Sequence, residues 1–298
     1  MTRPVFPNVL VMIGLDHRDS SVIDAVVESA GRLGIGSVHL CHIDNRDPVA
    51  GPLQGLMAAQ YSEAPPELAA AAARLADELP EGVQVAAHHL IGPTEAVLVE
   101  AVAKHDVDLV VMGRNPAIDG QPGWGSSRRK LLRLTTCSVL VVPHNTKADW
   151  GRVVCGMDFS QNARTALSVA CHAADSIDAV YQYNPKAVVE AGRKQEEFRQ
   201  QVATNARKIM ERDILPKVAS GASRPNLVVH PGGKVADVLI RYADGSPIVM
   251  GSRGLTPLAA LLLGSSADRV AGRALGPVLI VRQKGSVLGL LESLVYKA

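Results

Sequence analysis

Aromatic residues are scarce in this chain, and their scarcity restricts how its core can be built. Three Phe, two Trp and five Tyr make up 3% of the 298 residues, whereas hydrophobic residues as a whole make up 47%. The core therefore has to consist of Val, Leu, Ile and Ala, which is typical of buried parallel strands covered by helices on both faces. The length is sufficient for two domains of ordinary size.

Cysteine pairs, long apolar runs and an excess of one charge are also missing. The four cysteines show no C-x-x-C spacing, which favours buried free thiols in a reducing compartment. These cysteines are Cys41, Cys137, Cys155 and Cys171. No apolar run reaches the length of about 18 residues that a transmembrane helix needs. The apolar run 9–15 ends at Asp16, so it indicates a strand and not a secretion signal. A net charge of +2 argues against a nucleic-acid-binding domain. We therefore expect a cytoplasmic protein with neither a membrane nor a nucleic acid as its partner.

One pattern of apolar runs occurs twice. The run 9–15 ends at Asp16, and the run 153–157 ends at Asp158, 142 residues later. In each copy five apolar runs predict strands, and the segments between them have helical periodicity. The predicted strands are 9–15, 37–43, 83–90, 109–112 and 139–142 in the first copy, and 153–157, 179–183, 226–229, 248–250 and 278–281 in the second.

Strands that alternate with helices predict parallel sheets joined by right-handed crossovers. We expect an α/β protein with two tandem open five-stranded parallel sheets and flanking helices. The predicted domains are 1–146 and 147–283, with a polar linker at 143–150, and a tail at 284–298. The apolar residues of the tail favour a terminal helix docked on a domain or on a partner subunit. A membrane anchor is the weaker interpretation, because the polar face of the tail has almost no Lys or Arg.

A glycine-rich loop in the second copy has the pattern of a phosphate cradle. Gly251-Ser252-Arg253-Gly254, nine residues and Gly264-Ser265-Ser266 stand between the predicted strand 248–250 and a helical pattern. Glycines let backbone N–H groups approach an anion, and the helix N-terminus adds partial positive charge. Turn and cap chemistry is the alternative interpretation of these residues. The loop is neither a Walker A motif nor a dinucleotide fingerprint.

The spacing Gly-x-x-Gly, nine residues, Gly-Ser resembles the nucleotide-binding loop of the universal stress protein family in its ATP-binding branch. With the repeat, nearly the whole chain resembles a tandem member of that family. The resemblance implies an adenine-nucleotide alpha-hydrolase-like, Rossmann-like fold and a stress-response regulatory protein that binds ATP, with Mg²⁺, in its second domain. AMP and ADP are alternative ligands. A slow ATPase or ATP-dependent transferase and a nucleotide-free scaffold stay open as alternative functions, although no general base is identifiable in the sequence.

The resemblance also implies roles for particular residues. Asp158 would lie by the adenine and ribose, the backbone of Tyr183 would read the adenine edge, and Met250 would lie against the nucleotide. The phosphates would be held by Gly251, Arg253, Gly254, Gly264, Ser265 and Ser266. The resemblance further implies that the two domains pair within the chain, that two chains form a homodimer, and that a regulatory protein partner exists.

The first copy departs from this pattern. Its loop reads Gly113-Arg114-Asn115-Pro116, eight residues and Gly125-Ser126-Ser127, so that a proline replaces the second glycine. Proline has no N–H and cannot adopt a positive φ, and we interpret this site as degenerate, either empty or altered in ligand. Asp16 and His42 remain at the positions of Asp158 and Tyr183. The basic residues that follow favour a solvated helix face over an anion site. They are Arg128, Arg129, Lys130 and Arg133.

Two histidine patterns are weak metal candidates. His88 and His89 are adjacent in a predicted strand, so they face opposite ways and cannot hold one ion together. Convergence of Asp16, His17 and His42 at strand ends would offer a metal site, but a satisfied polar strand end is the preferred interpretation. Ser160, two residues after Asp158, is predicted to cap the following helix.

Overall fold

The computed structural model describes residues 5–45, 60–115, 126–185, 195–217, 223–252 and 263–282. The elements of the first half are β1 (Asn8–Ile13), α1 (Asp19–Leu33), β2 (Ser37–Asp44), β3 (Gln60–Ser62), α2 (Pro66–Glu78), β4 (Gln84–Ile91), α3 (Thr94–Lys104), β5 (Leu109–Arg114), α4 (Ser126–Leu134) and β6 (Ser138–Pro143). Those of the second half are β7 (Arg152–Met157), α5 (Gln161–Ala173), β8 (Ser176–Tyr183), α7 (Gln195–Ile209), the π-helical turn η1 (Met210–Ile214), the 3₁₀ turn η2 (Leu215–Lys217), β9 (Asn226–Pro231), α8 (Val235–Ala243), β10 (Ile248–Gly251), α9 (Ser265–Arg273) and β11 (Val278–Val281).

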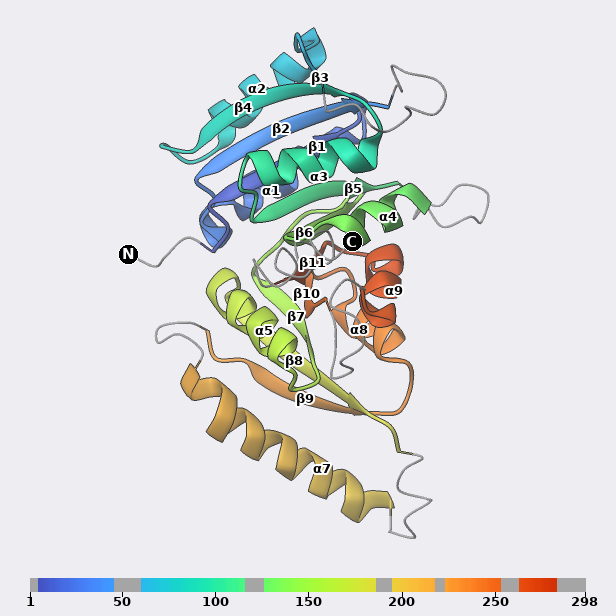
Figure 1. The fold of residues 1–298 in the computed structure, drawn as a ribbon. Helices are drawn as coiled ribbons and strands as arrows, with labels where there is room; N and C mark the ends of the chain where they lie inside the picture. Colours follow the sequence, from blue (N-terminus) through green and yellow to red (C-terminus); the bar gives the residue numbers. More distant parts are fainter. Residues whose placement is uncertain are drawn as a thin grey trace, which may run out of the picture.

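Both predicted five-stranded parallel sheets are present, which confirms the expected α/β fold. The strand orders are β4-β2-β1-β5-β6 and β9-β8-β7-β10-β11, so the two halves have the same topology. The two sheets join edge to edge, because β6 pairs with β11 in the antiparallel sense. The expected pairing of the halves within the chain is therefore present, and Figure 1 shows them at opposite ends of one continuous sheet. The short antiparallel edge strand β3, which pairs with β4, was not predicted.

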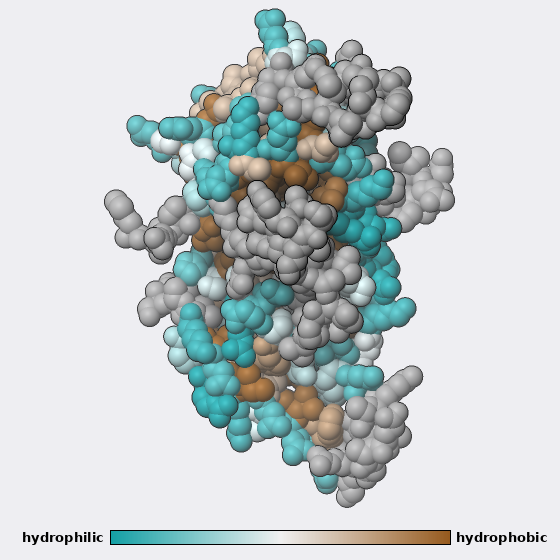
Figure 2. All heavy atoms as spheres, viewed as in Figure 1, coloured by the Kyte–Doolittle hydropathy of each residue, from teal (hydrophilic) through white to brown (hydrophobic). Residues whose placement is uncertain are grey.

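The core lies on both faces of this sheet. Alternate residues of β1 belong to different clusters: Val9 and Val11 pack under α1, whereas Leu10 packs on the opposite face with α3. Helices α1, α2 and α5 cover the first face, and α3, α4, α8 and α9 cover the second. Because strands buried on both faces read as continuous apolar runs, the runs in the sequence identified them correctly. In Figure 2 most of the coloured surface of one face is hydrophilic, and hydrophobic residues are visible between the hydrophilic ones.

The predicted polar linker is packed against the first half. Trp150 is buried and its Nε1–H donates to the Ser29 hydroxyl at 3.0 Å, while the Ala148 N–H donates to Glu28 Oε2 at 2.6 Å. Both acceptors lie on α1, which also packs against α5. The connection between the halves is thus part of their shared core. The four cysteines are free and buried, as predicted.

Two arginines link the halves by capping helices across the junction. The Arg114 guanidinium, at the end of β5, donates to the carbonyls of Ala271 and Ala274 at the C-terminus of α9, with a distance of 3.0 Å to Ala271. Arg282, after β11, donates to the carbonyls of Leu132 and Thr135 at the C-terminus of α4, with 2.6 Å to Leu132. Each cation lies at the negative end of a helix dipole and satisfies carbonyls that have no partner within the helix.

We expect Arg114→Ala to lower the free energy of unfolding by about 2 kcal/mol, because charge-assisted hydrogen bonds to the end of α9 are lost. Urea denaturation followed by far-UV circular dichroism measures the change. Arg241→Ala is the matched control: Arg241 is exposed, and its Nε donates to the Asp237 carbonyl within its own helix, α8. A control variant destabilised as much as Arg114→Ala would contradict the junction role.

Candidate functional site

A cavity of about 310 Å³ lies in the second half at the carboxyl ends of β7 and β10. In open α/β sheets ligands bind at this edge, where the order of the strands reverses. The cavity brings together six of the nine site residues that the sequence predicts. These six are Asp158, Met250, Gly251, Gly264, Ser265 and Ser266. Arg253 and Gly254 lie outside the described residues.

Asp158 follows β7 and is one of the residues that line the cavity. Its Oδ1 accepts the N–H of Ser160 at 3.0 Å, and the Ser160 hydroxyl accepts the N–H of Ala163 at 3.2 Å. Ser160 therefore caps α5, which confirms its predicted role. Among the side chains that the structure describes, no Lys or Arg forms an ion pair with Asp158. The carboxylate thus retains acceptor capacity for hydroxyl groups of a ligand.

The N-terminus of α9 closes the cavity on another side. Gly264 is its N-cap residue, and no side chain accepts a hydrogen bond from the first turn within the described part of the chain. The Gly264 N–H donates to the Ser252 carbonyl at 2.8 Å, whereas Ser265, Ser266 and Ala267 line the cavity. The first N–H groups of a helix have no partner inside it, and they carry the positive end of the helix dipole. This corner of the cavity is suited to an anion.

Gly251 has a structural reason for being glycine in addition to its place in the loop. A Cβ atom at this position would lie 2.8 Å from the backbone carbon and the Cβ of Asn162, in the first turn of α5. The end of β10 therefore approaches α5 more closely than a side chain allows. Met250, one residue earlier, is buried in the core and also lines the cavity.

Tyr183 is not among the residues that line the cavity. Its carbonyl accepts the N–H of Gly232 at 2.8 Å and the Nε2–H of Gln182 at 2.7 Å. Its ring is buried and lies 6.1 Å, between centroids, from the ring of Phe198. The neighbouring Gln182 lines the cavity instead. Sequence reasoning also missed the lining residues Ala163, Val235 and Leu239, which lie on helices α5 and α8.

The first half has a cavity of about 300 Å³ at the corresponding edge, but its charges are arranged differently. The Arg18 guanidinium forms a bidentate pair with Asp16, with 2.9 Å between Nε and Oδ1. This hydrogen bond holds the pKa of Asp16 at about 2. The carboxylate is therefore committed to a neighbour within the chain. Pro116, which defines the degenerate loop, lies outside the described residues.

Strand pairing shows a further difference between the two cavities. Leu10 pairs with Val110, three residues before Gly113, and Val154 pairs with Ile248, three residues before Gly251. Counting four residues onward places Gly14, not Asp16, at the position of Asp158. The acid of the first half thus belongs to a longer turn, in which Asp19 accepts the N–H groups of Gly14 and Asp16.

The other polar candidates are consistent with their structural interpretations. Asp16, His17 and His42 do not form a metal-ligating group in the described ranges, and His42 Nδ1 is bonded to the Ile13 carbonyl. His89 lies on the face of β4 opposite to His88, and its Nδ1 is 3.0 Å from the Glu63 carbonyl oxygen. The basic residues of α4 are exposed where their side chains are described, and Arg129 pairs with Asp268 of α9. No described helix is long and apolar enough to cross a membrane, and the predicted tail 284–298 lies outside the described residues.

Comparisons with known proteins agree with the repeat. A profile of the universal stress protein family matches residues 6–143 and 150–282. A functionally unknown protein from Pseudomonas aeruginosa PAO1 aligns with a TM-score of 0.65 and 19% identity over 98% of each chain. A putative universal stress protein from Pseudomonas aeruginosa UCBPP-PA14 aligns with a TM-score of 0.62 and 19% identity over 98% of each chain. A universal stress protein from Archaeoglobus fulgidus DSM 4304 aligns with a TM-score of 0.56 and 15% identity over 93% of this chain and 97% of its own. A comparison with curated proteins found no match. At these identities the structural likeness concerns the fold.

Proposed function

Because this chain belongs to the universal stress protein family, we propose that its second half binds an adenine nucleotide in the cavity beside Asp158. The observation that carries the proposal is the pairing of two chemistries in one cavity. An uncapped helix N-terminus with two serines lies at one side, and a carboxylate without a cationic partner in the described residues lies at the other. A nucleotide presents anionic phosphates and ribose hydroxyls to such groups.

The phosphates would lie at the start of α9, where the N–H groups and the hydroxyls of Ser265 and Ser266 donate hydrogen bonds. Asp158 would accept from the ribose, and Gln182 supplies an amide for the base. Tyr183 would support the position of Gln182 through its carbonyl. We propose ATP with Mg²⁺ as the ligand, with AMP or ADP as the alternatives. Arg253 and Gly254 would complete the phosphate contacts.

We propose regulation, through ligand-dependent shape or partner binding, as the role of this site. Asp158 is the one titratable side chain among the described lining residues. Rapid hydrolysis would need a base beside the γ-phosphate in addition to the groups that hold the nucleotide. A cytoplasmic location, domain limits at 1–146 and 147–283, and a homodimer with a regulatory partner belong to the same proposal. Light scattering that shows only a 31.5 kDa species would contradict the homodimer.

Isothermal titration with Mg-ATP tests the proposal, and we expect one site per chain. Gly254→Pro, which copies the loop of the first half, is expected to abolish binding while the thermal denaturation midpoint stays unchanged. Pro116→Gly is the reciprocal variant and is expected to leave the stoichiometry at one, because Arg18 still occupies Asp16. Titrations with AMP and ADP identify which phosphates matter.

Each other result of this titration has a clear meaning. Two sites in the unmodified protein would contradict the degenerate first half. Absence of binding by ATP, ADP and AMP would overturn the nucleotide proposal and favour a scaffold. Release of phosphate from bound ATP at a rate that Ser265→Ala abolishes would move the protein to the ATPase alternative.

A further inference from the structure

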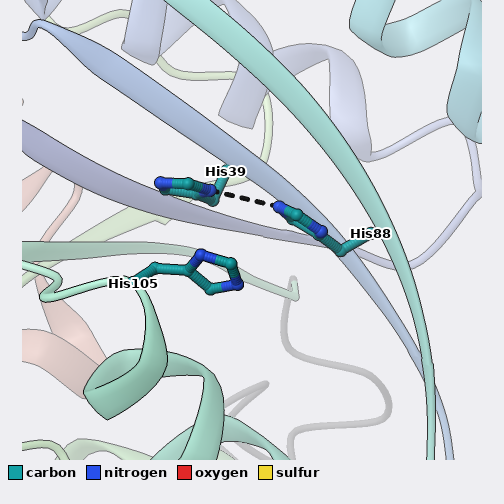
Figure 3. Close-up of side chains that lie close together, drawn as sticks. All are labelled: His39, His88 and His105. Atoms are coloured by element: carbon teal, nitrogen blue, oxygen red, sulfur yellow. Dashed lines mark hydrogen bonds between the residues drawn. The ribbon is translucent and has the colours of Figure 1, made fainter. Parts of the chain in front are cut away.

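Three histidines from separate parts of the first half converge on one face of the sheet. His39 lies in β2, His88 lies in β4, and His105 is the C-cap residue of α3. In the β2–β4 pairing Cys41 lies opposite His88, and side chains two residues apart in a strand point to the same face. His39 therefore points to the same side as His88, where α3 and its C-cap cover the sheet. Figure 3 shows the three rings turned toward one another.

The ring nitrogens are close enough to act on one ligand. His39 Nδ1 lies 3.1 Å from His88 Nε2, and one nitrogen from each of the three rings lies within 4.8 Å of the others. The ring centroids are 5.3 Å apart for His39 and His88, 4.2 Å for His39 and His105, and 4.7 Å for His88 and His105. In the ranges that the structure describes, no other group of three His, Cys, Asp or Glu side chains is arranged in this way.

Burial disfavours the charged form of the three imidazoles. All three are partly buried, and desolvation is the largest cause of a lowered pKa at each of them. The pKa of His88 falls to about 4, because the positive charges of His105, His39 and Lys104 would add to the effect of burial. A neutral imidazole has one nitrogen lone pair available for a metal ion.

The same place in the second half shows that the fold does not require these histidines. Leu10 and Val154 occupy equivalent positions in the two halves. Leu10 pairs with His39 and Val154 pairs with Asp178, so Asp178 stands at the position of His39. His39 pairs with Ala86 and Asp178 pairs with Asn226. Two residues further along each strand, Val228 therefore stands at the position of His88. Asp106, which follows the C-cap residue of α3, and Asp244, which is the C-cap residue of α8, both have left-handed backbones. When these two residues are matched, Ala243 stands at the position of His105.

The second half fills this place with a paired charge. The Arg152 guanidinium donates to Asp178 Oδ2 at 3.0 and 3.1 Å, and Asn226 donates to Asp178 Oδ1 at 3.0 Å. A carboxylate there has its opposite charge built into the chain. The first half instead places three imidazoles there, and imidazole nitrogens are common ligands of transition-metal ions.

We propose that His39, His88 and His105 bind one divalent transition-metal ion of the Zn²⁺ type, with a coordination position left open to solvent or a ligand. Zn²⁺ bonds to imidazole nitrogen at about 2.0–2.1 Å, so tetrahedral ligands lie about 3.4 Å apart. His39 and His88 are already near that separation, and side-chain rotation of His105 brings in the third nitrogen. Imidazole ligands favour Zn²⁺, Cu²⁺, Ni²⁺ or Fe²⁺, whereas Mg²⁺ and Ca²⁺ take oxygen ligands. This site is separate from the nucleotide cavity and does not depend on it.

Titration of the chelator-treated full chain with Zn²⁺ alone tests the site. We expect one high-affinity ion per chain and a raised thermal denaturation midpoint, with no effect of Mg²⁺ on that midpoint. Co²⁺ in place of Zn²⁺ should give visible d–d absorption of a four-coordinate site. His88→Gln is expected to weaken Zn²⁺ binding by more than about 100-fold, exceeding the loss seen when only a supporting partner of a ligand is removed.

His89→Gln is the matched control, because His89 is adjacent in β4 and faces away from the cluster. It should bind Zn²⁺ as the unmodified chain does. His105→Gln is the second test, because its position after α3 lies outside the sheet and so keeps the test independent of strand packing. Lys104→Gln should tighten binding, since the Lys104 charge that lowers the pKa of His88 and His105 also repels a dication.

Several outcomes would overturn the site. The proposal fails if the unmodified chain binds no Zn²⁺, or if His88→Gln and His105→Gln both fold and bind as tightly as it does. Loss of binding in His89→Gln would assign the ion to the stacked pair His42 and His89, whose ring centroids are 5.7 Å apart. Far-UV circular dichroism on each variant shows whether it is folded before its affinity is compared.

Discussion

Gly276→Ala is expected to destabilise the second half more than alanine at any other glycine that the structure describes. A Cβ atom at Gly276 would lie 2.0 Å from the Gly245 carbonyl oxygen and 3.0 Å from that of Ser246. Both obstacles are backbone atoms in the turn after α8, so no side-chain rotation relieves the overlap. Separating β11 from this turn would also disturb the hydrogen bond from the Ile248 N–H to the Pro277 carbonyl. We expect the free energy of unfolding to fall by about 4 kcal/mol or more, which is a large share of ordinary domain stability.

Urea denaturation followed by circular dichroism measures this change, and Gly31→Ala is its control. Gly31 is exposed in α1, and an added Cβ would meet no atom within 4 Å. Alanine there is expected to raise stability by up to about 1 kcal/mol, because glycine is the weaker helix former. The first half holds Cys137 at the position of Gly276, buried without such an overlap. A loss below about 1 kcal/mol in Gly276→Ala would show that the turn at Gly245 moves aside easily.

Ser265→Asp is expected to change stability and nucleotide binding in opposite directions. Ser265 is exposed in the first turn of α9, where a carboxylate interacts favourably with the helix dipole by about 0.5 kcal/mol. The same carboxylate would stand where we propose the phosphates bind. Two like charges about 4 Å apart repel by about 4 kcal/mol at an effective dielectric constant of 20, and Mg²⁺ reduces this value. We therefore expect Mg-ATP affinity to fall by about 100-fold while the thermal denaturation midpoint rises slightly.

The matched control is Ser126→Asp, because Ser126 begins α4 as Ser265 begins α9. It should leave Mg-ATP affinity unchanged if the second half alone binds the nucleotide. Isothermal titration measures the Mg-ATP affinity of each variant, and thermal denaturation measures its midpoint. Equal affinity in Ser265→Asp and the unmodified protein would place the ligand away from α9, and equal losses in both variants would indicate a site in each half.

Much of the fold could be predicted because its strands are buried on both faces. Runs such as 109–112 and 248–250 have almost no polar residue, which distinguishes them from the amphipathic helices between them. The edge strand Gln60–Ser62 escaped prediction, because three residues that pair on one side have no comparable apolar pattern. The paired edges β6 and β11 are apolar like the inner strands, so their sequences did not reveal that they meet.

The candidate site was predictable where backbone position alone decided it. Asp158 and Gly251 end neighbouring parallel strands, so both had to reach the same edge of the sheet. The resemblance assigns a backbone role to Tyr183, which stays a prediction, and the structure adds that its ring is buried and that Gln182 lines the cavity. Side chains alternate along a strand, so a shift of one residue exchanges the buried and the exposed position.

Sequence alone establishes the two-fold repeat, the alternation of strands and helices, and the glycine and serine positions between β10 and α9. These depend on local periodicity and backbone preference, which each segment carries independently of the others. The packing of the linker on α1 and the meeting of His39, His88 and His105 depend on the tertiary structure instead. These contacts join residues that lie far apart along the chain, and no local sequence pattern indicates that they meet. Only the register of neighbouring strands and the packing of helices on the sheet bring them together.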